Sequence, residues 1–408
     1  MRLLRRPIAV TSVFKEKAMS LQSTTSGERL HIGFFGMRNA GKSSLVNAIT
    51  GQELSVVSDV KGTTTDPVKK AMELLPLGPV VIIDTPGLDD EGDLGEKRVQ
   101  KAKQILGQTD IAVLVVDATI GLSEQDRQLE ALFLEKKIPY LTVWNKADQV
   151  SDRAKDRLYA SAVTGEGVEP IKEKLGQFAA KMKNEKVIVS DLMQQGDVVV
   201  LVTPIDESAP KGRLILPQQM TIRDILDHHG ITVTVQPEEL KETLTKITPA
   251  MVITDSQVFD RVSKDVPNEI PLTSFSILMA RYKGELSALQ AGAKALANLK
   301  DGDKVLISEG CTHHRQCNDI GTVKMPAWIE NYCKAKPEFS FTSGGIFPDD
   351  LKEYKVIVHC GGCMLNEAEM KHRLAKAEAQ GVPMVNYGMA IAAMHGILDR
   401  SLQVFKKD

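Results

Sequence analysis

The segment Gly36-Met37-Arg38-Asn39-Ala40-Gly41-Lys42-Ser43 decides the fold of the first third of the chain. It follows a short strand-like run at residues 31–35 and leads into a helix-like run at residues 45–49. A loop with glycine near both ends turns backbone N–H groups toward phosphate oxygens, while its lysine offsets phosphate charge and its serine ligates Mg²⁺. The segment therefore predicts a strand, a phosphate-binding loop and a helix. The residues expected to contact the phosphates are Gly36, Asn39, Ala40, Gly41, Lys42, Ser43 and Ser44.

Three further apolar runs predict more strands of the same sheet. Each run ends in a polar residue: residues 80–83 at Asp84, residues 111–116 at Asp117, and residues 140–144 at Asn145. Strands that alternate with helical stretches form a doubly wound parallel sheet, whose ligand loops gather at the carboxyl ends of the strands. We therefore expect an α/β P-loop domain at residues 29–182 with a nucleotide site at that edge.

The residues that would carry hydrolysis of the nucleotide come from three of these loops. Asp84 can hold Mg²⁺ together with Ser43, and the backbone N–H of Gly87 can contact a γ-phosphate. Thr64, in the threonine-rich stretch 62–67, is the expected Mg²⁺ ligand in the GTP-bound state. The predicted catalytic set is Lys42, Ser43, Thr64, Asp84 and Gly87.

The motif Asn145-Lys146-Ala147-Asp148 predicts that the base is guanine. An aspartate at this place can accept hydrogen bonds from both N1–H and N2–H of guanine, an arrangement that adenine cannot satisfy. Ser161 and Ala162 begin a stretch at the distance of the loop that covers the base. GTP and GDP are therefore the predicted nucleotides.

Composition excludes several classes of function. With 408 residues the chain is long enough for two to four domains, and 42% hydrophobic and 25% charged residues describe an ordinary globular protein. A net charge of −2 gives no electrostatic case for nucleic acid as the main partner. No apolar run approaches the roughly 20 residues of a membrane span. Five cysteines, an odd number, favour the reducing cytoplasm.

The first residues carry a basic leader without the continuous apolar core of a secretory signal. An organelle transit peptide is one interpretation. We favour the other, in which an upstream start codon precedes Met19 as the real beginning. Residues 1–28 are therefore left out of the fold argument.

The middle of the chain predicts a small α/β domain at residues 187–265. Apolar runs at residues 196–204, 231–235 and 250–254 are typical of strands. The adjacent His228 and His229 lie at an expected helix end, where cationic side chains suit the helix dipole, so a structural role is favoured over metal binding. Since no catalytic spacing is present, we expect an interaction module through which the chain forms a homodimer.

The last third, residues 270–408, contains all five cysteines. Cys311 follows an expected strand at residues 304–308, and Cys360 follows another at residues 354–358. Because parallel strands end at one edge of a sheet, the two cysteines are placed to meet there. Cys360-Gly361-Gly362-Cys363 can turn two thiolates inward around one metal centre. From spacing alone, zinc and an iron–sulfur cluster are equally compatible, and a redox or purely structural cysteine set is the third interpretation.

The GTP-binding motifs resemble those of the translation-factor-related GTPases that include Era and the tRNA-modifying TrmE. The resemblance implies hydrolysis of GTP to GDP and phosphate. Leu88, just after Gly87, cannot orient an attacking water, so intrinsic hydrolysis should be slow or need another element. Asn39 occupies the position at which TrmE-like GTPases carry an asparagine that helps hold K⁺, which implies K⁺ stimulation; a loop asparagine that tolerates left-handed backbone is the alternative.

The whole arrangement resembles the [FeFe]-hydrogenase maturation GTPases, the HydF family. Cys311-x-His313 and His359-Cys360-x-x-Cys363 carry this resemblance, because they follow a P-loop GTPase and a middle domain. It extends from about Met19 to near the carboxyl terminus.

The HydF resemblance implies a [4Fe-4S] cluster bound by Cys311, Cys360 and Cys363. Candidates for its fourth ligand are His313, His359 and Asn318. It also implies a scaffold or carrier that receives material from radical-SAM maturases, assembles a transient [2Fe] subcluster precursor and delivers it to apo [FeFe]-hydrogenase.

The alternative functions are a tRNA-modification or ribosome-assembly GTPase, and a GTPase with a structural zinc module. Cys317 and Cys333 lie outside the motif and are expected to be core or surface thiols.

Overall fold

The computed structural model describes residues 26–52, 68–85, 102–182, 187–205, 214–284, 286–310, 319–362 and 364–405. Several predicted site residues lie outside the described residues: Thr64, Gly87, Cys311, His313, Asn318 and Cys363. Leu88 and Cys317 lie outside them as well. Within the described part, the chain forms three sheets that follow one another in sequence.

The first sheet has the strand order β2-β3-β1-β4-β5-β6. Its strands are β1 (Leu30–Phe35), β2 (Val68–Leu74), β3 (Gly78–Asp84), β4 (Ile111–Asp117), β5 (Tyr140–Asn145) and β6 (Leu158–Tyr159). Its helices are α1 (Lys42–Thr50), α3 (Glu124–Glu135), α4 (Val168–Met182) and the helical residues 102–106, with short 3-10 turns at Ser26–Glu28 and Ala147–Gln149. All pairings are parallel except that of the edge strand β2, which runs antiparallel to β3. The expected parallel α/β domain is confirmed.

Both faces of this sheet are covered, which explains why its central strands are apolar throughout. Phe34 and Val113 pack on one face with residues of α1 and α4. Phe35 and Leu114 pack on the other face with Phe133 of α3 and with the helical residues 102–106. A strand that is buried on both faces has a continuous run of apolar residues, as β4 does. The phosphate-binding loop is thereby fixed at the carboxyl end of β1.

The second sheet has the order β10-β9-β7-β8, with all strands parallel. Its strands are β7 (Val198–Val202), β8 (Ile231–Val235), β9 (Met251–Thr254) and β10 (Leu272–Ser274). The helices around it are α5 (Leu216–Asp227), α6 (Leu240–Lys246), α7 (Phe259–Asp265) and α8 (Phe275–Lys283), with 3-10 turns at Ser190–Leu192 and Ser256–Val258. The sheet thus extends past residue 265, where the sequence placed the end of this unit. The extra strand, β10, has three residues, too few to show a periodic pattern.

The third sheet has the order β12-β11-β13-β14 and is also parallel. Its strands are β11 (Lys304–Glu309), β12 (Glu338–Ser343), β13 (Val356–His359) and β14 (Met384–Asn386). The helices are α9 (Leu286–Leu296), α10 (Met325–Cys333), α11 (Glu367–Ala379), α12 (Tyr387–Met394) and α13 (Leu398–Leu402). A π-helical turn spans Ile320–Lys324, and a 3-10 turn spans Gln403–Phe405.

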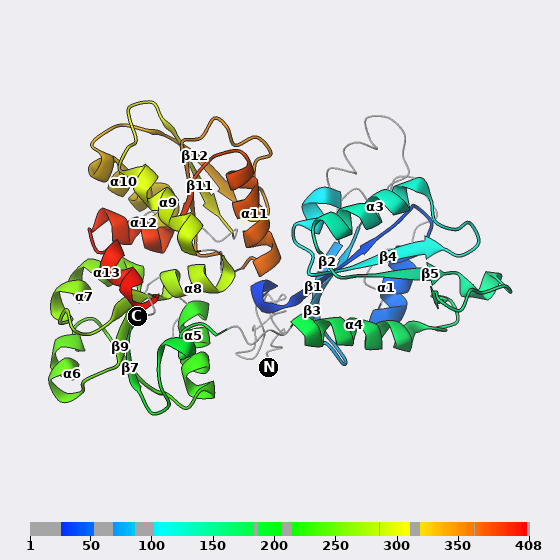
Figure 1. Cartoon of the computed structure of the whole chain (residues 1–408), viewed down its shortest axis with the longest axis horizontal. Coiled ribbons are helices and arrows are strands. Elements are labelled where there is room, and N and C mark those ends of the chain that lie inside the picture. Colours follow the sequence, from blue (N-terminus) through cyan, green and yellow to red (C-terminus); the bar gives the residue numbers. More distant parts are fainter. Residues whose placement is uncertain are drawn as a thin grey trace, which may run out of the picture.

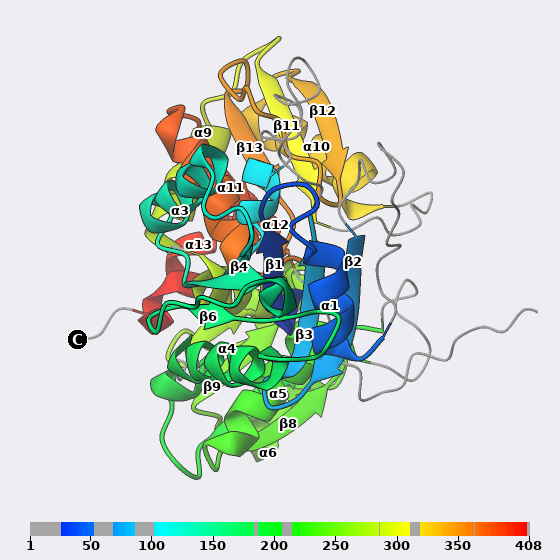
Figure 2. The same cartoon turned by 90° about the vertical axis from the view of Figure 1, so that its right-hand side faces the viewer.

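Two helices of the third unit, α11 and α13, lie toward the other two units. Figure 1 shows the first unit on one side and α11 of the third unit facing it. Figure 2, seen from the side of the first unit, shows β11 and β13 above and β8 and β9 below. The carboxyl-terminal helix α13 returns to the second unit, where the Arg400 guanidinium donates to the carbonyls of Ser263, Val266 and Pro267 at 2.8–2.9 Å.

No helix among the described residues is long and apolar enough to cross a membrane.

Candidate functional site

The phosphate-binding loop has backbone geometry that only glycine accepts easily. Gly36 has φ 138° and Gly41 has φ 85°. A Cβ at Gly36 would lie 2.2 Å from the Val115 carbonyl oxygen, and one at Gly41 would lie 2.3 Å from the Asn145 amide nitrogen. These two glycines are therefore required by both conformation and space.

Lys42 begins α1 and turns its side chain back over the loop. Its ammonium donates to the carbonyls of Gly36 at 3.0 Å and Met37 at 2.7 Å, and the residue is 7% exposed. The positive charge thus lies within the turn that would enclose a phosphate chain. This placement allows Lys42 to neutralise charge on a bound β- or γ-phosphate.

Ser43 and Asp84 form the part of the site that suits Mg²⁺. The Ser43 hydroxyl donates to Asp84 Oδ2 at 2.6 Å. The other carboxylate oxygen of Asp84, Oδ1, is buried and has no hydrogen-bond partner among the described residues. A buried carboxylate oxygen without a partner is costly, and a hard cation that prefers oxygen ligands removes that cost. The pair therefore fits a Mg²⁺ ion.

The base-binding motif is connected directly to the phosphate-binding loop. Asn145 Nδ2 donates to the Ala40 carbonyl at 2.9 Å, and its Oδ1 accepts from the Ala162 N–H at 3.2 Å. Ser161 donates to Asp148 Oδ1 at 2.6 Å. One amide side chain thus holds three loops in register, and the base-binding motif is fixed beside the phosphate-binding loop.

Lys146 of this motif forms an ion pair with Asp117. The Lys146 ammonium lies 2.5 Å from Asp117 Oδ2. Burial alone would raise the pKa of Asp117, but hydrogen bonds from Lys146 and Thr119 outweigh it and hold the pKa below its ordinary value. Asp117 therefore stays ionised and keeps Lys146 oriented.

Asn39 lies exposed at the tip of the loop and has φ 58°. Asparagine tolerates this left-handed conformation better than most residues do. The backbone therefore explains an asparagine here without a cation, and a role in holding K⁺ stays a prediction. Ala40 and Ser44, the other predicted contact residues, lie in the loop and in the first turn of α1.

The third sheet brings the two cysteine segments to one edge. Ser308 of β11 lies opposite His359 of β13 in the parallel register. The Cys360 N–H donates to the Ser308 carbonyl at 2.9 Å, and the Gly310 N–H donates to Cys360 Sγ at 3.0 Å. Gly310 immediately precedes Cys311, which lies outside the described residues. Within the described residues, the register of β11 and β13 therefore agrees with the expectation that the two cysteine segments meet at this edge.

The backbone around Cys360 suits a thiolate. A second N–H, that of Gly362, faces Cys360 Sγ at 3.4 Å. Gly362 has φ 61°, and a Cβ there would lie 2.6 Å from Met370 Sδ. A Cβ at Gly310 would meet Leu365 at 2.8 Å. The two glycines let backbone N–H groups approach the sulfur, and such hydrogen bonds stabilise negative charge on a metal-bound thiolate.

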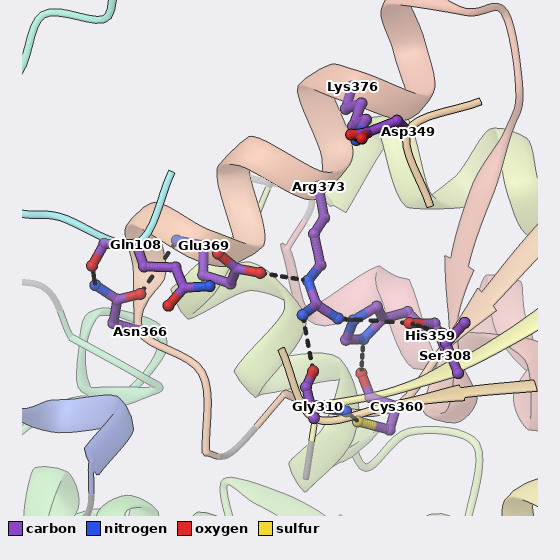
Figure 3. Close-up of polar contacts among 12 residues, drawn as sticks. Gln108, Ser308, Gly310, Asp349, His359, Cys360, Asn366, Glu369, Arg373 and Lys376 are labelled. Carbon is purple, nitrogen blue, oxygen red and sulfur yellow. Dashed lines mark hydrogen bonds and ion pairs between the residues drawn. The ribbon is translucent and has the colours of Figure 1, made fainter. Parts of the chain in front are cut away.

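His359 is buried and has both ring nitrogens engaged. Nδ1 donates to the Cys360 carbonyl at 2.7 Å, and Nε2 accepts from Arg373 Nη1 at 3.1 Å. Burial, followed by the charge of Arg373, lowers the pKa of His359 to about 3. The ring is therefore neutral and holds the backbone of Cys360 in place, as Figure 3 shows.

Arg373 of α11 is fully buried and organises this region (Figure 3). It donates to Glu369 Oε1 at 2.8 Å and to the Gly344 carbonyl at 2.9 Å, in addition to His359. Sequence reasoning missed both Arg373 and Glu369. Their four-residue spacing on a helix is visible in the sequence, but such pairs usually lie on the surface.

Asn366 connects α11 to the first unit. Its Oδ1 accepts from the Glu369 N–H and so caps the helix, while its Nδ2 donates to the Gln108 carbonyl at 3.0 Å and to Asp110 Oδ2 at 3.1 Å. Asp110 also accepts from the His31 N–H at the start of β1, at 2.8 Å. A continuous set of contacts therefore runs from the strand before the phosphate-binding loop to the helix behind Cys360.

A cleft of about 740 Å³ opens beside this contact, between the first and third units. It is lined by Lys136 and Lys137 from one side and by Lys371 and His372 from the other. Burial, followed by the charge of Lys136 and Lys376, lowers the pKa of His372 to about 4.

No group of three or more metal-binding side chains occurs among the described residues. Of the cysteines, only Cys360 and Cys333 fall within them. Cys333 ends α10, and its thiol contacts the Glu330 and Ala335 carbonyls. It lies outside the cysteine motif, so it serves as a control position.

The fold and the first site define a P-loop GTPase domain joined to two smaller parallel α/β units. The profile described as "50S ribosome-binding GTPase" matches residues 31–146. Residues 188–284 match the "Hydrogen maturase F dimerization domain", and residues 287–404 match the "Hydrogen maturase F tetramerization domain". The chain belongs to the hydrogen maturase F family.

Two curated GTPases each match less than half of the chain. GTPase Der of Kosmotoga olearia is 32% identical over an alignment of 177 residues, and the match covers 38% of this chain and 40% of that protein. The tRNA modification GTPase MnmE of Legionella pneumophila strain Corby is 36% identical over an alignment of 190 residues, and the match covers 45% of this chain and 42% of that protein. The chain thus spans about two fifths of the length of these relatives. A crystal structure of Aquifex aeolicus Era is 18% identical, with a TM-score of 0.34, and the match covers 50% of this chain and 92% of that one.

Proposed function

We propose that this chain is a GTP-hydrolysing scaffold that binds a [4Fe-4S] cluster, assembles a [2Fe] subcluster precursor and delivers it to apo [FeFe]-hydrogenase. The observation that carries the proposal is the contact of Gly310 with Cys360, because it brings the residue before Cys311 against the first thiol of the Cys-x-x-Cys loop. This contact lies in a chain of the hydrogen maturase F family.

The nucleotide site would work through positioning and charge. Lys42 offsets phosphate charge, Ser43 and Asp84 hold Mg²⁺, and Thr64 completes the ion's ligands when GTP is bound. The N–H of Gly87 would contact the γ-phosphate and so distinguish GTP from GDP. Since Leu88 cannot orient water, a cation near the β/γ bridge would help, and Asn39 is proposed to hold K⁺ there.

The cluster would be held by Cys311, Cys360 and Cys363, and it would supply an iron whose fourth position is exchangeable. His313 and Asn318 are the favoured candidates for that position. His359 is less suited, because its nitrogens are used by Arg373 and by the Cys360 carbonyl. An exchangeable position suits a carrier, since its cargo must bind and leave.

Partners and organisation follow from the same family. We propose radical-SAM maturases as donors and apo [FeFe]-hydrogenase as acceptor, in the cytoplasm. The dimerization and tetramerization profiles support oligomerisation, with the homodimer formed through residues 188–284. On the evidence of β10, we propose that the second unit ends after α8 rather than at residue 265.

Complementation tests the function as a whole. A strain that lacks its hydrogenase maturation GTPase would be supplied with this chain, and hydrogenase activity would be measured. We expect recovery with the wild type and with Cys333→Ser, and loss with Lys42→Ala or Cys360→Ser. A wild-type chain that is expressed and folded but restores no activity would overturn the maturation role.

The cation is tested separately. GTP hydrolysis would be measured in K⁺ and in Na⁺ for the wild type and for Asn39→Ala. We expect faster hydrolysis in K⁺ and no difference between cations for the variant. Equal wild-type rates in both cations would refute the K⁺ assignment.

A further inference from the structure

The cleft between the first and third units is a cavity of small-molecule size, separate from the nucleotide site. Its volume is about 740 Å³, and ligand pockets of roughly 300–1,000 Å³ occur preferentially where domains meet. Asp110 and Pro139, the residues that precede β4 and β5, line it. The nucleotide site lies at the opposite, carboxyl ends of these strands, roughly 20 Å away along a strand of seven residues.

The lining of the cleft combines apolar side chains with an excess of lysines. Leu106 and Ile138 of the first unit and Ala375 of the third are among the apolar residues. Two carboxylates also line the cleft, and four lysines outnumber them. These lysines are Lys136 and Lys137 after α3, Lys181 near the end of α4, and Lys371 of α11. Pockets for small molecules have this character, apolar over most of the lining with a few charged groups.

Both carboxylates already have partners. Glu367 pairs with Lys371 at 2.6 Å. Asp110 accepts from the His31 N–H at 2.8 Å and from Asn366 Nδ2 at 3.1 Å, so it serves the contact between the units.

The lysines that the first unit contributes lack such partners. Lys136, Lys137 and Lys181 are exposed, and none of them forms an ion pair within the part of the chain that the structure describes. Their charge is therefore available to a ligand in the cleft.

His372 marks the place where the positive charges converge. Its ring packs so closely on Gly107 that a Cβ there would lie 2.5 Å from His372 Cδ2. The charged groups that face the ring are Lys136 of α3, Arg373 and Lys376 of α11, and Asp349. Asp349 is itself paired with Lys376 at 2.5 Å (Figure 3). Cations thus surround the imidazole from both units, and an anion bound here would relieve their repulsion.

The helix dipole explains only part of this arrangement. Lys136 caps α3 and Lys181 lies in the last turn of α4, where cations suit the carboxyl end of a helix. Lys371 lies in the second turn of α11, where no such benefit exists. The dipole also gives no reason for lysines of three helices to line one cavity. A ligand of opposite charge does give one.

We propose that this cleft binds a phosphorylated small molecule of nucleotide size, with its phosphates among Lys136, Lys137 and Lys371 and its apolar part against Leu106 and Ile138. Lysine binds phosphate as a point charge, so lysines on two walls suit more than one phosphate oxygen. Because the walls belong to different units, the bound anion would hold the first and third units together. This site is independent of the proposed cluster.

The first experiment measures binding of ATP to the full-length chain by isothermal titration calorimetry. The protein would be saturated with GDP and Mg²⁺, so that the guanine site is filled. We expect ATP to bind with a Kd below about 1 mM. Tripolyphosphate should bind more weakly, because it lacks the part that packs on apolar residues. Absence of binding by both would overturn the inference, and equal affinities would overturn the assignment of an organic ligand.

Paired substitutions locate the site. Lys136→Gln/Lys371→Gln should weaken ATP binding at least about tenfold, because each change removes a hydrogen bond to a charged group. Lys174→Gln/Lys241→Gln is the matched control, since it removes the same charge from exposed lysines of α4 and α6 that do not line the cleft. Equal loss in both pairs, or no loss in the first, would overturn the inference. Circular dichroism melts check that both pairs fold.

The ring of His372 gives a readout that a general charge effect would not move. Bound phosphate should raise the pKa of His372 from its value of about 4, because a nearby negative charge favours the imidazolium. NMR titration of histidine-labelled protein with and without ATP measures this change, and His372→Gln assigns the resonance. An unchanged pKa of His372 in the ATP-bound protein would place the ligand elsewhere and overturn the inference.

Discussion

Replacement of Arg373 by methionine should destabilise the third unit strongly. The side chain is fully buried, and its partner Glu369 is 4% exposed. Methionine keeps much of the arginine's volume but none of its donors. The substitution leaves the Glu369 carboxylate buried without its 2.8 Å partner and leaves the Gly344 carbonyl without its 2.9 Å donor.

The size of the effect follows from the cost of an unpaired buried charge. Removal of one partner of a buried ion pair costs about 3–5 kcal/mol, whereas replacement of both partners by apolar residues is often nearly neutral. The double variant Glu369→Met/Arg373→Met should therefore recover most of the loss. Against a total stability of roughly 5–15 kcal/mol for a domain, the single variant would lose between about a fifth and all of that stability.

Tryptophan fluorescence provides the assay. The chain has two tryptophans, Trp144 in β5 and Trp328 in α10. In a Trp144→Phe background, urea unfolding followed by Trp328 reports on the third unit, because Trp328 packs against its core. A loss below about 1 kcal/mol in the single variant, or a double variant no more stable than the single, would refute the reasoning.

Three further predictions concern the other contacts. Asp84→Asn should slow Mg²⁺-dependent GTP hydrolysis by at least about a hundredfold, because a metal ion contributes several kcal/mol to such a step; a steady-state phosphate-release assay at wild-type rate would contradict this. Asn366→Ala should remove the cap of α11, worth about 1 kcal/mol, together with its bonds to Gln108 and Asp110. Hydrogen exchange should then quicken in the first turn of α11 and at residues 108–110, and unchanged exchange at both would count against the contact. His372 has an ordinary pKa of 6.5 and a folded-state pKa of about 4, so the unfolded state binds a proton that the native state excludes. Stability should therefore fall as the pH decreases from 6.5 to 4; thermal melts should show a flatter pH dependence for His372→Gln, and an equal slope in both proteins would contradict the assignment.

The central strands could be predicted from the sequence because they are buried on both faces. The run 111–116 lies within β4, which has no polar residue before Asp117. The edge strand β12 was missed for the opposite reason: it alternates polar and aromatic residues and is only half-buried. Propensity alone does not separate such a segment from a loop.

For the candidate site, the sequence alone was enough to predict which segments of the chain lie together. A parallel sheet gathers the ends of its strands, and the structure brings Gly310 against Cys360 at such an edge. The residues around the cysteines could not be found in this way. Arg373 is a buried cation, and only the tertiary fold shows that its neighbour is a histidine ring. Sequence patterns place charged residues on the surface by default.

Anaerobic reconstitution of the wild type with iron and sulfide, with Cys360→Ser and Cys333→Ser alongside, tests the central claim most directly. The wild type and Cys333→Ser should bind iron and sulfide in the amount of one [4Fe-4S] cluster per chain and give an EPR signal on reduction, while Cys360→Ser should lose most of both. Stoichiometric zinc without colour in the wild type, together with unchanged metal content in Cys360→Ser, would contradict the account.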